Sequence, residues 1–380
     1  MSVGENTNQV TIATSTDGIS WSNVAPFVGT TSSSGAVAYG DGQWLAFGGR
    51  YLNAPFRAEG VTMISTNGTS WLVQTNIIPF SLGLRYALAF GQDKWVMFTK
   101  FFNTNVYTAS SSNFNWTPTP LPSFPGAGSF SDVHFANGLW VAVGYLPTAT
   151  NPVPLIITSP NGTNWTRRSV SVTNATLDAV AYAQGQWVAV GSESIYFPLC
   201  SIYPVSTALV LTSLDGANWI RRDTSLPRGP DVISRSSLSG ITWTGDEWVA
   251  VGLYQVLTER ALLLTSPDAI TWQMHVSVIG AGLEFAAYGN SRVVAGGATT
   301  LLLSAPIVPA APVLGLNRAG NQLSLFLSGS IGATYDIEQA AQLVPPSWAT
   351  VQSLTLSNAS QQILVSPATN SSAYWRAHRL

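Results

Sequence analysis

A short phrase that returns six times constrains the fold of this chain more than any other feature. Each clear copy has a Ser, an Asp or Asn two residues later, and a Trp four residues after that Asp or Asn. The Asp and Asn residues are Asp17, Asn67, Asn161, Asp215 and Asp268, and the Trp residues are Trp21, Trp71, Trp116, Trp165, Trp219 and Trp272, with a weaker copy before Trp116. Repetition at a period near 50 residues is typical of propellers, solenoids and arrays.

A second phrase lies between the copies of the first. In its first copy, Tyr39 precedes a turn with two Gly residues, and Trp44 opens an apolar run that ends at Gly48. The Trp residues at this position are Trp44, Trp95, Trp140, Trp187 and Trp248, and a sixth copy over 287–296 has lost its Trp. Eleven of the 14 Trp residues therefore fall in the two repeated positions.

Each phrase predicts a β-hairpin, because a tight turn with Gly and Asp or Asn separates two short apolar or alternating runs. Two hairpins per repeat make a four-stranded sheet, and a ring of such sheets is a β-propeller. We name the strands A to D outward from the axis, so that the second phrase forms the A–B hairpin and the first phrase the C–D hairpin. No helical periodicity competes, and the predicted fold class is all-β.

The order of the hairpins predicts how the ring closes. The chain begins with a C–D hairpin over 10–25, and the array ends with an A–B hairpin over 285–297. Pairing of these two predicts a six-bladed β-propeller with one blade shared between the two ends. Residues 300–304 resemble a further C strand that competes for the same position, so seven blades, one of them partial, are the alternative.

The repeated residues have structural roles in this interpretation. The Asp or Asn side chain accepts hydrogen bonds from backbone N–H groups two or more residues further on. The Gly supplies a positive φ without steric cost. The Trp packs between adjacent blades and buries on the order of 200 Å².

The phrase Ser-x-Asp-Gly-x-x-Trp resembles a shortened Asp-box, the repeat of the sialidase-like (BNR) propellers, over about residues 10–305. The resemblance implies the fold but no single activity, because such propellers include glycosidases, lectins, assembly factors and uncharacterised bacterial surface proteins. A sialidase is not indicated, since the Phe-Arg-Ile-Pro motif of that family is absent before the first copy.

The long connections between strands all fall on one face of the predicted propeller. The A–B and C–D turns are short, so the long B–C and D–A loops carry the variation and lie at the opposite face. The B–C loops include residues 50–60 and 192–207. Variable loops on a rigid scaffold are where binding usually occurs. The candidate ligand-binding residues on this face are Arg50, Tyr51, Arg57, Arg85, Tyr145, Glu193, Arg235 and Tyr254. The alternative is that loops carry the charges because strands cannot.

Composition excludes several classes of function. Only 9% of residues are charged and the net charge is −2, whereas a general nucleic-acid binder has a basic surplus. Cys200 is the only cysteine, so no intrachain disulfide can form. No run of 18 apolar residues predicts a membrane span, and residues 1–10 show no signal peptide. No residue pattern indicates a metal site, a cofactor or a catalytic nucleophile.

A second, smaller module follows the repeats. Residues 306–312 form a Pro- and Ala-rich linker, and about six short strands over 313–380 predict a small β-sandwich. The patterns around Tyr335, Trp348 and Trp375 resemble a terminal module of exported proteins from verrucomicrobial and planctomycete bacteria. That resemblance implies secretion or the cell envelope, and it implies no activity.

The sequence thus predicts a non-enzymatic, monomeric binding protein of the cell surface or exterior, with its repeat domain over 1–305. Its ligand is a glycan or a protein, bound at the long-loop face. The alternatives are a glycoside hydrolase, which would need two suitably spaced carboxyl groups on that face, and an assembly scaffold, which would need a broad surface patch.

Overall fold

The computed structural model of the chain consists of β-strands, and its described residues contain no helix. These residues are 2–6, 9–17, 20–24, 32–53, 56–79, 86–99, 104–122, 128–148, 151–195, 205–224, 226, 235–256, 258–276, 281–289, 291–297, 301–304, 313–319, 322–328, 333–340, 348–356, 360–365 and 374–379. Within those ranges no helix is long and apolar enough to cross a membrane. The fold is all-β, as the short apolar and alternating runs predict.

The chain divides into two compact units. The first comprises residues 1–242 and 248–304, and the second comprises residues 305–380 together with 243–247. The first unit contains both repeated phrases, and it carries the candidate site described below.

Five four-stranded antiparallel sheets form the regular part of the first unit. Within each sheet, the strands are hydrogen-bonded in chain order. The strands are β4 (Ser32–Gly40), β5 (Gln43–Asn53), β6 (Phe56–Ser65) and β7 (Leu72–Pro79); β8 (Tyr86–Gly91), β9 (Lys94–Thr99), β10 (Asn105–Ser110) and β11 (Thr117–Pro120); β12 (Ser129–Ala136), β13 (Leu139–Leu146), β14 (Val153–Ser159) and β15 (Thr166–Arg168); β16 (Ala175–Ala183), β17 (Gln186–Ile195), β18 (Val205–Ser213) and β19 (Ile220–Arg222); β20 (Arg235–Trp243), β21 (Trp248–Gln255), β22 (Glu259–Ser266) and β23 (Gln273–Val276).

A three-stranded sheet stands at each end of this series. The first contains β1 (Ser2–Asn6), β2 (Gln9–Thr14) and β3 (Ser22–Val24), and the last contains β24 (Phe285–Gly289), β25 (Arg292–Gly296) and β26 (Leu301–Leu303). The predicted pairing of residues 10–15 with the last A–B hairpin does not occur among the described strands. Instead, β2 pairs with β1 and β3, and β26 takes the position beside β25. A short connection joins β25 to β26, so their pairing closes a much smaller loop than pairing with the far end of the repeats.

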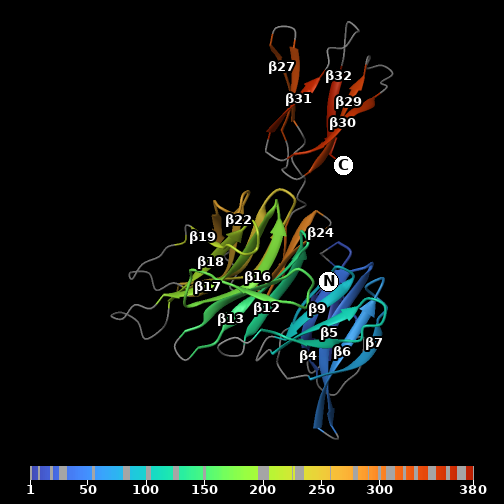
Figure 1. Ribbon diagram of the computed structural model, residues 1–380, viewed down its shortest axis with the longest axis vertical. Coiled ribbons are helices and arrows are strands. Elements are labelled where there is room, and N and C mark those ends of the chain that lie inside the picture. The colour runs from blue at the N-terminus through green and yellow to red at the C-terminus, as the bar shows by residue number, and fades with distance from the viewer. Residues whose placement is uncertain are drawn as a thin grey trace. The chain divides into compact units, whose positions relative to one another are not determined.

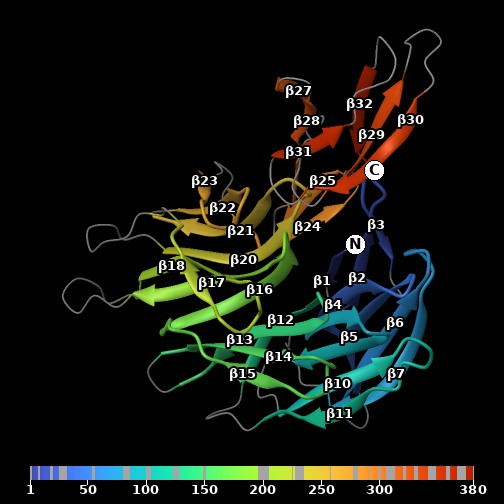
Figure 2. The ribbon, with the colours of Figure 1, turned by 45° about the horizontal axis from the view of Figure 1, so that its top comes forward.

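The sheets follow one another around a common centre, with the first strand of each regular sheet innermost (Figure 2). Strand β4 lies beside β8, β8 beside β12, and β12 beside β16. This radial arrangement of antiparallel sheets is the architecture of a β-propeller.

Several predicted loops are in fact extensions of strands. Residues 50–60, predicted as a B–C loop, continue β5 and β6 as a long hairpin, visible at the bottom of Figure 1, in which Arg50 pairs with Glu59 and Leu52 with Arg57. Strands β17 and β18 likewise extend until Ile195 pairs with Val205. These residues were predicted as loops because they connect a B strand to a C strand, but their aromatic and aliphatic residues favour paired strands.

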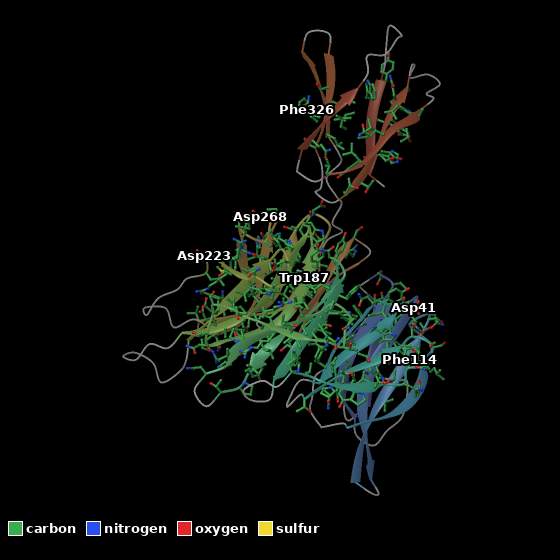
Figure 3. The ribbon with its side chains drawn as sticks, in the orientation of Figure 1. Asp41, Phe114, Trp187, Asp223, Asp268 and Phe326 are labelled. Carbon is green, nitrogen blue, oxygen red and sulfur yellow. The ribbon has the colours of Figure 1, made fainter. Side chains whose placement is uncertain are left out.

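The inner tryptophans lie at the start of the second strand of each regular sheet, and four of the five are buried in the packing. Trp95, Trp140 and Trp248 are completely buried, and Trp187 is 1% exposed. Figure 3 shows Trp187 among the packed side chains of the first unit. The first repeated phrase forms turns that we call Asp-box turns, after the motif that they resemble. Their Trp residues pack between sheets, as when Trp165 meets the ring of Phe98 edge-on at 5.0 Å. These contacts join each sheet to the preceding one.

The second unit has two three-stranded antiparallel sheets. One contains β27 (Val313–Ala319), β28 (Gln322–Ser328) and β31 (Ser360–Val365), and the other contains β29 (Thr334–Ala340), β30 (Ala349–Thr355) and β32 (Tyr374–Arg379). Both contribute to one hydrophobic core, which includes Leu325, Leu327, Tyr335, Ile337 and Ile363. On its surface, Arg376 bonds Glu338 and lies 4.5 Å from the ring centre of Trp348.

Candidate binding site at the inner strands

The Asp-box turns form rigid corners at one end of the sheets. Asn161 Oδ1 accepts hydrogen bonds from the backbone N–H groups of Thr163 and Asn164 at 3.0 and 2.9 Å, and Trp165 Nε1 donates to the carbonyl of Gly162 at 3.0 Å. Equivalent bonds to a side-chain oxygen occur at Asp17, Asn67, Asp215 and Asp268. The N–H groups of Asn218 and Ala217 hold the pKa of Asp215 well below its usual range. Each such side chain therefore stabilises its own turn.

Hydrogen bonds between sheets place the two kinds of turn at the same end of the molecule. The residue before an inner tryptophan donates its side-chain N–H to a backbone carbonyl in the Asp-box turn of a later sheet. These bonds are Gln43 to Ser111 at 3.3 Å, Lys94 to Asn161 at 3.0 Å and Gln186 to Asp268 at 2.9 Å. We call this the turn end, and we call the opposite end, where the innermost strands begin, the loop end.

The innermost strands bulge near the loop end. Register breaks occur between Phe130 and Asp132 in β12, and between Leu177 and Ala179 in β16. The opposing residues are glycines of the repeated phrase. A Cβ atom on Gly144 would lie 1.9 Å from the carbonyl oxygen of Ser129, and one on Gly191 would lie 2.0 Å from that of Thr176. The glycine that ends each apolar run therefore lets the inner strand approach closely as it bulges.

A cavity of about 270 Å³ lies beside these bulges, and we call it the axial cavity. Four innermost strands, or the residues just before them, contribute its lining. The lining residues are Ser131, Asp132, Asp178, Ala179, Ser239, Gly240, Ile241, Glu284, Phe285 and Ala286. Its polar side chains are three carboxyl groups and two hydroxyl groups.

Asp132 links two of the sheets that form the axial cavity. Its Oδ1 accepts a hydrogen bond from the N–H of Val133 at 2.8 Å, and its Oδ2 accepts one from the N–H of Val180, on β16, at 2.9 Å. Burial raises the pKa of Asp132 to about 7, although both of these N–H groups act to lower it. Near neutral pH, the carboxyl group therefore exchanges between its protonated and ionised forms.

The other two acids of the axial cavity come from equivalent points of the repeat. Asp178 and Glu284 each lie nine residues before the inner tryptophan or its replacement, as do Ser131 and Ser239. Thr176 Oγ1 donates to Asp178 Oδ2 at 3.4 Å, and the backbone N–H of Glu284 donates to the carbonyl of Gly296 at 2.6 Å. Among the described residues, no group of three His, Cys, Asp or Glu side chains is arranged to hold a metal ion.

None of the predicted ligand residues whose side chains the structure describes lines the axial cavity. Tyr145 on β13 and Tyr254 on β21 are partly buried, and Arg235 is exposed at the start of β20. Glu193 on β17 makes an ion pair with Arg221 on β19. Arg50, Tyr51 and Arg57 lie in the β5–β6 hairpin, but their side chains, and the whole of Arg85, are outside the described residues.

Asp132, Asp178 and Glu284 were not predicted, because they belong to the innermost strands or the residues just before them and not to the long loops. Their signal was nevertheless present in the sequence. In a chain with only 9% charged residues, Asp132 and Asp178 interrupt otherwise uncharged strands eight and nine residues before an inner tryptophan. Glu284 lies nine residues before the position that has lost its Trp. A charge placed inside such a strand calls for a hydrogen-bonding partner or a ligand.

Solved structures share the fold at low sequence identity. A GH74 xyloglucanase from Xanthomonas campestris matches with a TM-score of 0.56 and 11% identity, over 84% of this chain and 55% of the enzyme. The chain thus spans about half of that enzyme's length. The polysaccharide lyase Uly1 matches with a TM-score of 0.49 and 9% identity, over 77% of this chain and 86% of the lyase. A WD40 β-propeller domain of Doa1 matches with a TM-score of 0.46 and 12% identity, over 78% of this chain and 85% of the domain.

No protein-family model matches the sequence, and no curated protein matches it either. The structural likeness therefore concerns the fold alone. The Asp-box assignment stays a prediction from the repeated phrase.

Proposed function

We propose that this chain is a non-enzymatic binding protein that holds a sugar residue of a glycan in the axial cavity. The observation that supports this is the convergence of three carboxyl and two hydroxyl groups on one cavity at the loop end. Carboxylates accept hydrogen bonds from sugar hydroxyls, and serine hydroxyls both donate and accept. The volume of about 270 Å³ is just below the usual range of roughly 300–1,000 Å³ for small-molecule sites, so a single sugar ring suits it better than a longer segment.

The loop end extends the proposed site beyond the axial cavity. Tyr145, Arg235 and Tyr254 belong to strands that begin or end there, so they are proposed to contact the part of the glycan that leaves the cavity. The same proposal covers Arg50, Tyr51, Arg57 and Arg85. We further propose a seven-sheet ring with two partial sheets at its junction, a sandwich fold for the second unit, and a monomer outside the cell or in its envelope.

Glycoside hydrolysis is the second candidate function. A carboxyl group with a pKa near 7 beside further carboxylates resembles the pairing of acid and base that glycosidases use. However, both oxygens of Asp132 already accept backbone N–H groups. Such a group serves to join β12 to β16 and is poorly placed to protonate a leaving group. We therefore prefer binding without cleavage.

A glycan array followed by isothermal titration tests the proposal. Asp178→Asn and Glu284→Gln should each weaken binding at least tenfold, because each replaces a carboxylate acceptor in the axial cavity. The control Asp223→Asn changes an exposed acid that follows the outer strand β19 and should bind normally. Hydrolysis of the bound glycan and of aryl glycosides should be absent. Hydrolysis by the wild type that is lost in Asp178→Asn would establish the hydrolase. An array on which the wild type binds no glycan would refute the glycan proposal.

A further inference from the structure

A second cavity, of about 460 Å³, lies where the last sheet meets the first two. It opens between the first Asp-box turn, the β4–β5 turn and the β24–β25 turn, so it belongs to the turn end. We call it the seam pocket. Its lining includes Asp17, Trp21, Tyr39, Trp44, Tyr288 and Arg292.

Regular junctions show what normally fills this position. At two regular junctions, the aromatic residue five positions before an inner tryptophan packs onto a glycine of the preceding sheet. A Cβ atom on Gly40 would lie 2.3 Å from the side chain of Phe90, and one on Gly91 would lie 2.2 Å from that of Phe135. The corresponding glycine of the last sheet is Gly289, where an added Cβ would have no atom within 4 Å. The seam therefore lacks the aromatic ring that fills the regular junctions.

The aromatic residues at the seam are correspondingly open to solvent. Tyr39 is 57% exposed, and Trp44 is partly exposed, whereas the other four inner tryptophans are buried. The rings of Tyr39 and Trp44 are 4.9 Å apart with an interplanar angle of 55°, so together they form an aromatic corner. Trp21 and Tyr288 add further aromatic surface from the first and last sheets. Aromatic residues that are packed at the regular junctions thus line an open pocket at the seam.

The polar groups of the seam pocket restrict what can occupy it. Asp17 brings a carboxylate, whose Oδ1 accepts bonds from Ser15 Oγ and the N–H of Ser20. Arg292 brings a guanidinium, whose Nη1 donates to the carbonyl of Ser304 at 3.0 Å. A cation would be repelled by Arg292 and an anion by Asp17. A neutral ligand with both donors and acceptors is compatible with the two charges together.

We propose that the seam pocket is a second carbohydrate site, which stacks one neutral pyranose residue on Tyr39 and Trp44. The apolar face of the ring occupies the space above Gly289, and its hydroxyl groups reach Asp17 and Arg292. The volume lies within the usual range for small-molecule sites. The site goes beyond the proposed function, because it belongs to the opposite end of the strands. Each end of the propeller then holds its own sugar residue.

Titration of the whole chain with neutral oligosaccharides (gluco-, xylo- and manno-series) tests this proposal, with tryptophan fluorescence as a second readout. The wild type should show a fluorescence change, because the ring stacks on Trp44. Tyr39→Ala should weaken this binding at least tenfold, and Tyr39→Phe should retain most of it. Tyr374→Ala, which removes an exposed aromatic side chain in the second unit, should bind as the wild type does.

This experiment distinguishes loss of binding at the axial cavity from loss of binding at the seam pocket. Asp178→Asn should leave the fluorescence change intact even if the axial cavity binds nothing. Loss of the signal in Asp178→Asn but not in Tyr39→Ala would assign all binding to the axial cavity and overturn the seam site. Equal affinity of Tyr39→Ala and wild type would also overturn it. Rapid formation of a disulfide between positions 39 and 289 in a Tyr39→Cys, Gly289→Cys variant would overturn it as well. Such a disulfide would mean that the junction closes in solution and leaves no space for a sugar.

Discussion

The regular junctions and the seam contain the same kinds of residue in different environments. At the junction between the β8–β11 and β12–β15 sheets, Phe135 covers Gly91, Trp140 is buried, and Lys94 bonds the next Asp-box turn. At the seam, Gly289 is uncovered, Tyr39 is exposed, and Arg292 bonds within its own sheet. A repeated residue thus acquires its role from its neighbour, and the same aromatic side chain packs in one place and offers a binding surface in the other.

Removal of an inner tryptophan should give the largest difference in stability loss between a regular junction and the seam. Trp140→Ala should lower the free energy of unfolding by about 3–5 kcal/mol, because the side chain is fully buried, meets Phe135 at 4.8 Å and donates to Gln92. Trp44→Ala at the seam should cost only about 1–2 kcal/mol, because part of that ring is already in water. Urea denaturation of both variants measures the difference. Equal losses would mean that the seam is as closely packed as the other junctions.

Two glycines, one at a regular junction and one at the seam, allow a matched test of the space next to each. Gly91→Ala should destabilise the chain by about 1–3 kcal/mol, because the new methyl group would collide with the ring of Phe135. Gly289→Ala should change stability by less than about 0.5 kcal/mol, since the added atom meets open space. Thermal unfolding followed by circular dichroism suffices for the measurement. A destabilised Gly289→Ala variant would show that the seam closes.

Asp132 makes one regular junction sensitive to pH. Its pKa is about 7 in the folded chain, so the folded chain binds this proton more tightly than the unfolded chain does. The stability it contributes is therefore fully present below about pH 4 and decreases as the pH rises toward 7. The difference in unfolding free energy between wild type and Asp132→Asn should fall by roughly 4 kcal/mol from pH 4 to 8, because the pKa is raised by about three units. A difference that is constant with pH would contradict this assignment.

Loss of one Asp-box side chain should have a modest effect at a regular junction and a smaller one at the seam. Asn161→Ala should cost about 1–2 kcal/mol, because two backbone N–H groups lose their acceptor in a turn that also bonds Lys94. Asp17→Ala should cost about 0.5 kcal/mol, since its turn is exposed and borders the seam pocket. Urea denaturation of the two variants compares them. A larger loss for Asp17→Ala would indicate that the first turn is as firmly docked as the others.

The regular part of the molecule was predictable because its signals are local. The turn after Ser159 depends on Asn161 and Gly162, and both residues act within a few positions of themselves. The all-β class and the hairpins follow directly from such patterns. The strand extensions at 50–60 were not predicted, because a connection between the B and C strands was expected to be a loop, whereas cross-strand pairing continues there.

The sequence by itself determined the repeat, the hairpins and the chemistry of their turns, since each depends on residues close together in the chain. Only the tertiary structure decided which side chains meet across sheets. Asp132 and Asp178 lie where inner strands bulge against glycines, Glu284 comes from the residue before β24, and no single repeat contains the information that they meet. The seam was equally hidden, because it arises where the repetition stops. Contacts between distant repeats depend on how the sheets close around the centre, and a local pattern cannot encode that closure.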